Sequence, residues 1–121
     1  MQPRYPKAEK LWPEAGWITD SDLRDKTLAV WEYALDHSPL TPEDLETIPF
    51  TLLIKDCDVT FMTHKRAVVH VSVEAAKKMR EMFGDKMPID MDVLVSAAIL
   101  CDVGKLLEYA RDGDGKLGQS Q

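Results

Sequence analysis

Several features are scarce in this chain, and their scarcity narrows the classes of protein it can belong to. No apolar run reaches the roughly 20 residues that a membrane span needs. The first seventeen residues hold Pro3, Pro6 and Pro13 without an apolar core, so they do not predict a signal peptide. We therefore place the chain in the cytoplasm, where its only two cysteines, Cys57 and Cys101, are expected to stay reduced.

Basic residues are also in the minority. The chain has 15 lysines and arginines against 21 aspartates and glutamates, which gives a net charge of -6. This balance argues against a general surface for nucleic acid or an anionic membrane. A small phosphate-bearing ligand remains compatible with it, because a local cation can outweigh the global charge.

The length and composition predict one compact domain. With 121 residues, 45% of them apolar, the chain can form a single core but hardly two. We expect an extended N-terminal arm over residues 1–19, which docks Trp12 and Trp17 on the domain or stays loose. An all-α domain should follow over residues 20–110, and a polar turn and tail over residues 111–121.

Capping residues and apolar periodicity predict the helices of this domain. An amphipathic helix should begin at Asp20 or Ser21 and end near residues 37–39, and a short helix should follow the Thr41 cap. Residues 50–54 are either a short strand or an extended buried segment.

The clearest helix is expected from about residues 61–65 to Phe83. One stripe of it is apolar and is expected to face the core, and His64 extends this stripe backwards by one turn. The residues of the stripe are Ala67, Val68, Val71, Ala75, Met79, Met82 and Phe83.

The next helix should begin after the Asp90 cap and run to Leu100. It is apolar nearly all round, which is typical of a central, buried helix. It ends on Cys101-Asp102-Val103-Gly104-Lys105, after which a further helical turn or two is expected.

The Asp102 carboxylate follows directly on this apolar helix. Burying a carboxylate beside apolar side chains costs several kcal/mol unless a cation or hydrogen-bond donors contact it. Asp102 should therefore have a partner, and a metal ion is one candidate.

His64 at the start of one helix, followed by Ile99 to Lys105 at the end of the next, resembles the HD superfamily of metal-dependent phosphohydrolases. The match covers roughly residues 64–109 and corresponds to the N-terminal part of that fold. The resemblance implies a compact helical domain that holds one or two divalent metals and hydrolyses phosphate esters or nucleotides. His64 matches the first metal-binding histidine, Asp102 the aspartate of the paired motif, and Lys105 the lysine after it.

The chain departs from the HD pattern in two ways. Cys101 stands where the second histidine is expected, and the later helices that carry further ligands are missing. His64, Cys101 and Asp102 thus make at most three metal ligands, so water or a partner chain, a second copy included, would have to complete the site. A thiolate favours zinc or ferrous iron over magnesium or manganese. In catalysis, Asp102 would ligate the metal and orient water, while Lys105 would neutralise phosphate charge.

Each of these residues also has a purely structural interpretation. Cys101 is most simply a small buried hydrophobe, Asp102 a turn cap, and His64 a helix-start histidine bonded to a carbonyl or carboxylate. The sequence therefore supports two hypotheses about function. The first is an HD-type phosphohydrolase with an altered or incomplete metal site, and the second is a non-catalytic HD-like subunit or interaction module that binds no metal.

Overall fold

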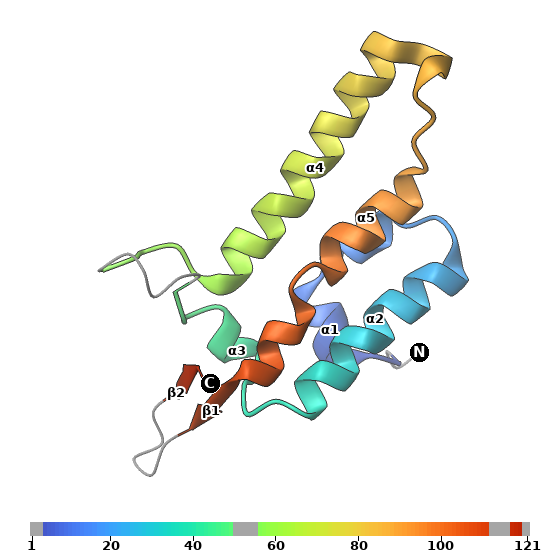
Figure 1. Ribbon diagram of the computed structural model, residues 1–121. Coiled ribbons are helices and arrows are strands. Elements are labelled where there is room, and N and C mark those ends of the chain that lie inside the picture. The colour runs from blue at the N-terminus through green and yellow to red at the C-terminus, as the bar shows by residue number, and fades with distance from the viewer. Residues whose placement is uncertain (1–3, 50–55, 112–116, 120–121) are drawn as a thin grey trace.

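A computed structural model describes residues 4–49, 56–111 and 117–119 and confirms an all-α fold with one small hairpin (Figure 1). The helices and strands, in chain order, are α1 (Pro6–Leu11), the 3₁₀ helix η1 (Pro13–Trp17), α2 (Ser21–Asp36), α3 (Pro42–Leu45), α4 (Phe61–Phe83), the 3₁₀ turn η2 (Gly84–Lys86), α5 (Met91–Leu100), the 3₁₀ helix η3 (Val103–Glu108), β1 (Tyr109–Arg111) and β2 (Leu117–Gln119). The expected segment at residues 50–54 lies outside the described residues.

The helix starts follow the capping residues of the sequence. The side chains of Asp20 and Asp90 accept hydrogen bonds from the first backbone N–H groups of α2 and α5. Thr41 and Asp44 form a capping box at α3. Thr60 caps α4, and Gly84 ends it with a φ of 56°, which is costly for a residue with a Cβ.

The prediction of an extended N-terminal arm is wrong. Residues 6–17 form α1 and η1, and both begin with a proline at a position where its fixed φ suits a helix. Trp12 is buried, which agrees with the alternative in which it docks on the domain, and it meets Trp31 edge to face, with 5.4 Å between ring centroids. Trp17, by contrast, remains 44% exposed. The N-terminal segment is therefore a helical layer of the core.

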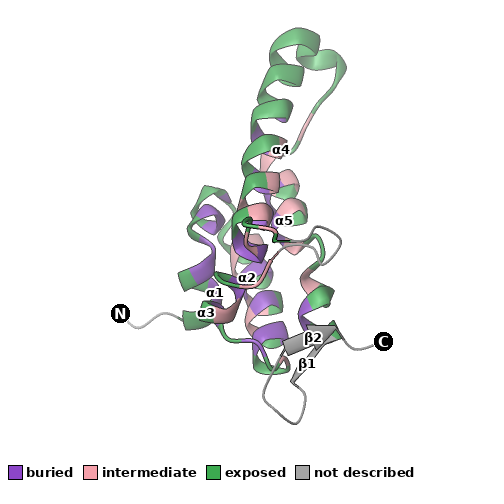
Figure 2. Ribbon diagram, turned by 90° about the vertical axis from the view of Figure 1, so that its left-hand side faces the viewer, coloured by how far each residue is buried: buried purple, intermediate pink, exposed green. Residues whose placement is uncertain are grey.

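The core lies between α1, η1, α2, the lower half of α4 and α5 (Figure 2). Trp31 of α2 is fully buried, and its indole Nε1 donates a hydrogen bond to the carbonyl oxygen of Ile99 at 2.8 Å. This bond satisfies a carbonyl at the end of α5 that has no partner within its own helix. α2 thereby fixes the end of the helix that carries the motif.

The prediction of which face of α4 enters the core is also wrong. The buried stripe consists of Met62, Lys65, Val69, Val73 and Ala76. Much of the stripe assigned to the core is exposed instead, with Val71 at 68% and Met82 at 71%. α4 runs beside α5 and then projects beyond it, and its last turns, residues 77–83, are exposed (Figures 1 and 2).

The C-terminal end differs from the expected tail, whereas the expected polar turn at residues 112–116 lies outside the described residues. β1 and β2 pair antiparallel, with Tyr109 opposite Gln119 and Arg111 opposite Leu117. η3 supplies the helical turn expected after Gly104. Across the described part of the chain, no helix has both the length and the apolar character needed to cross a membrane.

Candidate functional site

The motif residues lie where α5 ends beside the first turns of α4. α5 stops at Leu100, and Asp102 adopts a left-handed conformation with a φ of 65°. Aspartate tolerates this conformation better than most side chains. The Lys105 backbone N–H then donates to the Asp102 carbonyl at 3.0 Å, which starts η3. This turn directs the Asp102 carboxylate toward α4.

The partner that the sequence requires for Asp102 is a lysine. Lys65 Nζ donates to Asp102 Oδ2 at 2.6 Å, and only 6% of the Lys65 side chain is exposed. Lys105 Nζ lies 3.9 Å from the same oxygen. The hydrogen bond from Lys65 holds the pKa of Asp102 below its ordinary value, with smaller contributions from the charges of both lysines. Asp102 is therefore an ionised carboxylate with two cations beside it.

Sequence reasoning missed Lys65, although a signal for it existed. The residue lies three positions after Met62 and four before Val69, so it falls on the buried stripe of α4. A lysine on such a stripe requires an anionic partner in the interior.

His64 belongs to the same group of charges. Partial burial lowers the pKa of its imidazole, and the positive charges of Lys65 and Lys105 lower it further, against an opposing effect of Asp102. The neutral form of His64 is thus favoured near pH 7. The structure accordingly gathers His64, Asp102 and Lys105, three of the four residues that the sequence singled out, in one region.

The fourth residue, Cys101, is exposed, which contradicts its interpretation as a buried hydrophobe. Its side chain makes a small contribution to lowering the pKa of Asp102, less than that of Lys65. Within the described ranges, no three His, Cys, Asp or Glu side chains converge as a metal ion requires. With an ammonium group already on Asp102, these residues do not fit a divalent metal by themselves.

No family model, curated protein or solved structure matches this chain. The resemblance to HD phosphohydrolases thus depends on the motif residues alone.

A second polar cluster joins η1 to α4. Glu14 is 2% exposed, and its Oε2 accepts hydrogen bonds from Arg66 Nε at 2.7 Å and from His70 Nε2 at 2.8 Å. Burial raises the pKa of Glu14, but the bonds from His70 and Arg66 outweigh this and leave the pKa below its ordinary value. The His70 side chain is 52% exposed, and together with Arg66 it holds the N-terminal layer against α4 through Glu14.

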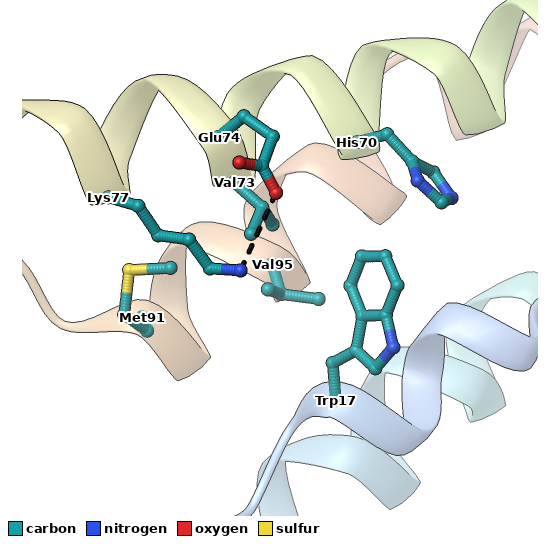
Figure 3. A pocket seen from close by; sticks show the side chains of 7 residues that line it. All are labelled: Trp17, His70, Val73, Glu74, Lys77, Met91 and Val95. Atoms are coloured by element: carbon teal, nitrogen blue, oxygen red, sulfur yellow. Dashed lines mark hydrogen bonds and ion pairs between the residues drawn. The ribbon is translucent and has the colours of Figure 1, made fainter.

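A cavity of about 440 Å³ opens beside this cluster (Figure 3). Its walls come from η1, α4 and α5, and its lining residues are Trp17, His70, Val73, Glu74, Lys77, Met91 and Val95. The Trp17 ring stands edge-on to His70, with 4.9 Å between centroids. Lys77 and Glu74 form a loose ion pair of 3.5 Å at the rim. Because these two charges neutralise each other, the cavity carries no strong preference for a charged ligand.

Proposed function

We propose that this chain is an HD-type phosphohydrolase domain with an incomplete metal site, acting on a phosphate ester or nucleotide. The observation that carries the proposal is the position of Asp102, at the end of α5, against the first turn of α4 that contains His64. The resemblance requires a histidine and an aspartate to meet in this way from two successive helices.

The roles of this chain's own residues follow from their charges. Lys105 is about half exposed and reaches the same carboxylate as Lys65, so its ammonium group is available to bind a phosphate oxygen. Neutral His64 offers a nitrogen lone pair. The described residues do not by themselves assemble the ligands of a divalent metal. A partner chain or a second copy would have to supply them.

One observation favours a second candidate, a non-catalytic HD-like interaction module. The Lys65 ammonium neutralises Asp102 at 2.6 Å, so this carboxylate needs no metal ion for its stability. In such a module, the motif would serve only to join α5 to α4.

Restoring the missing histidine separates the two candidates. We expect Cys101→His to increase the zinc or manganese bound to the purified protein and to increase hydrolysis of a generic phosphodiester or nucleotide. Adding Asp102→Asn should abolish both gains, since it removes the anionic ligand. Metal content is measured by elemental analysis and hydrolysis by phosphate or nitrophenol release.

Cys57→His is the matched control, because Cys57 is the other thiol and lies outside the motif. It should change neither metal content nor hydrolysis. If neither the natural chain nor Cys101→His binds metal or releases product, the proposal of a phosphohydrolase is overturned. The proposal of a non-catalytic module is then supported.

A further inference from the structure

The cavity between η1, α4 and α5 has the size and the lining of a small-molecule site (Figure 3). Its volume of about 440 Å³ lies within the range of protein binding cavities, roughly 300 to 1,000 Å³. Such cavities are lined mainly by apolar side chains, with a few polar groups that orient the ligand. Here Val73 and Val95 are buried and Met91 packs against the same core, so the apolar part of the lining is fixed in place.

His70 is the polar group of the lining that the rest of the structure holds in position. Its Nε2 lies 2.8 Å from Oε2 of the buried Glu14, to which Arg66 also donates. Burial raises the pKa of Glu14, but the bonds from His70 and Arg66 keep it below its ordinary value. Glu14 is therefore a carboxylate, and a carboxylate only accepts hydrogen bonds. His70 Nε2 must carry a proton to donate to it.

This assignment leaves Nδ1 as the nitrogen of His70 that a ligand can use. In a neutral imidazole, one nitrogen is a donor and the other is an acceptor. Because the proton is held on Nε2 by Glu14, Nδ1 offers a lone pair. A ligand that pairs with this nitrogen must supply an N–H or O–H group.

The aromatic wall of the cavity is the Trp17 indole. Its ring is 44% exposed and stands edge-on to His70, with 4.9 Å between centroids. Figure 3 shows Trp17 and His70 together at one end of the cavity, and Lys77 and Met91 at the other. An aromatic ring packs favourably against an indole and against a methionine sulfur. The lining thus favours a flat, aromatic ligand.

The charged residues of the lining favour a ligand without net charge. Lys77 Nζ lies 3.5 Å from Glu74 Oε1, and both side chains are exposed. A charged ligand would be attracted by one of these groups and repelled by the other, so it gains little from the pair.

We propose that this cavity binds a small, uncharged aromatic molecule whose N–H or O–H group donates a hydrogen bond to His70 Nδ1. Indoles and phenols belong to this class. The aromatic ring of the ligand packs against Trp17 and the buried valines. The inference does not depend on whether the motif site hydrolyses phosphate, because the residues that line the cavity are not those of the motif.

Indole and N-methylindole are the probes, because they differ in the N–H group and share the aromatic ring. Carbon–proton NMR follows the methyl groups of Val73, Val95 and Met91 in the natural chain at about pH 8.5, which favours the neutral imidazole. We expect indole to shift these resonances with a dissociation constant below about 1 mM. N-methylindole should bind about fivefold more weakly, since it leaves Nδ1 without a donor.

Variants of the two ring residues test the two parts of the site separately. His70→Phe keeps a flat ring and removes the lone pair, so it should bind the two probes equally. Trp17→Ala should weaken both probes by about fivefold, because it removes the aromatic wall. Tyr33→Ala is the matched control, since it removes an exposed ring that stacks on His37 of α2, with 4.0 Å between centroids. It should leave both dissociation constants unchanged.

Circular dichroism and the melting temperature establish that the variants fold. Equal affinities of the natural chain for the two probes would overturn the proposal, because the hydrogen bond to His70 would then be missing. The proposal also fails if indole shifts none of the three methyl resonances up to its solubility limit, or if Trp17→Ala and Tyr33→Ala weaken binding equally. Should His70→Phe not fold, the comparison of the two probes on the natural chain still decides.

Discussion

The two members of the Lys65–Asp102 ion pair differ in burial. Only 6% of the Lys65 side chain is exposed, against 42% of the Asp102 side chain. If Lys65 loses its charge, Asp102 keeps water and Lys105 as partners. If Asp102 loses its charge, the Lys65 ammonium stays in the interior without an anion. The cost of breaking the pair should therefore depend on which residue is changed.

We expect Asp102→Asn to lower the free energy of unfolding by about 2 kcal/mol, less than for a fully buried pair because the carboxylate is partly solvated. Asparagine also tolerates the left-handed backbone, so strain does not contribute. Lys65→Met, which keeps the length of the side chain, should cost less than about 1 kcal/mol. Urea denaturation at neutral pH measures both.

Lys26→Met provides the baseline for this comparison. Lys26 pairs with Asp22 on the exposed face of α2, and both side chains are about three-quarters exposed. This substitution should leave the urea midpoint unchanged. Equal losses from Asp102→Asn and Lys65→Met would contradict the difference in burial.

At the scale of elements, α2 and α5 are joined by a buried pair of hydroxyl groups. Thr27 Oγ1 lies 2.7 Å from Ser96 Oγ and also 2.7 Å from the carbonyl oxygen of Leu23. Thr27 has a single hydroxyl proton, which it donates to Leu23. Ser96 must therefore donate to Thr27.

Because Ser96 donates to Thr27, removing either hydroxyl should lower the free energy of unfolding by a different amount. Thr27→Val removes the acceptor of the buried Ser96 hydroxyl and should cost about 1 to 3 kcal/mol. Ser96→Ala leaves Thr27 bonded to Leu23 and should cost about 1 kcal/mol or less. The double variant should be more stable than the sum of the two losses implies, because no hydroxyl is then left unpaired. Thermal and urea unfolding of the four proteins supply the cycle, and strict additivity would contradict the assigned direction.

Elements with local signals could be predicted from the sequence. The caps Asp20, Thr41 and Asp90 specify where α2, α3 and α5 begin, because a cap requires only the next three residues. The meeting of His64 with Asp102 was also predicted, from the motif. The partner Lys65 could not be predicted in this way, because a lysine on an amphipathic helix is ordinarily expected on the solvent face.

Elements that depend on tertiary contacts could not be predicted in the same way. Prolines at residues 6 and 13 are equally compatible with an extended arm and with a first helical turn, and packing of Trp12 on Trp31 decides between them. α4 has two apolar stripes, and periodicity alone does not say which one α5 covers. The stripe with more apolar residues is the exposed one, with Val71 at 68% and Met82 at 71%.

At the scale of the whole molecule, two carboxylates hold distant segments together. Glu14 joins η1 to α4 through Arg66 and His70. Asp92, in the first turn of α5, accepts hydrogen bonds from the backbone N–H groups of Thr19 and Asp20 and from the Thr19 hydroxyl. The backbone bond from Thr19 contributes most to lowering the pKa of Asp92. Glu14 thus fixes η1 onto α4, and Asp92 fixes the segment between η1 and α2 onto α5.

These two carboxyl groups predict a loss of stability in acid. The pKa of each is lower in the folded than in the unfolded chain, so unfolding takes up protons once the pH falls below the unfolded value of about 4. The stabilisation they provide is complete above that pH and declines as the pH falls through their folded values. We expect the urea midpoint, at constant ionic strength, to decline gently below about pH 6.5, where unfolding lets His64 take up a proton, and to fall steeply below about pH 4. Glu14→Gln and Asp92→Asn should each lower the midpoint at neutral pH and reduce this slope, since each removes one titrating group. A slope unchanged in both variants would mean that other groups cause the acid sensitivity.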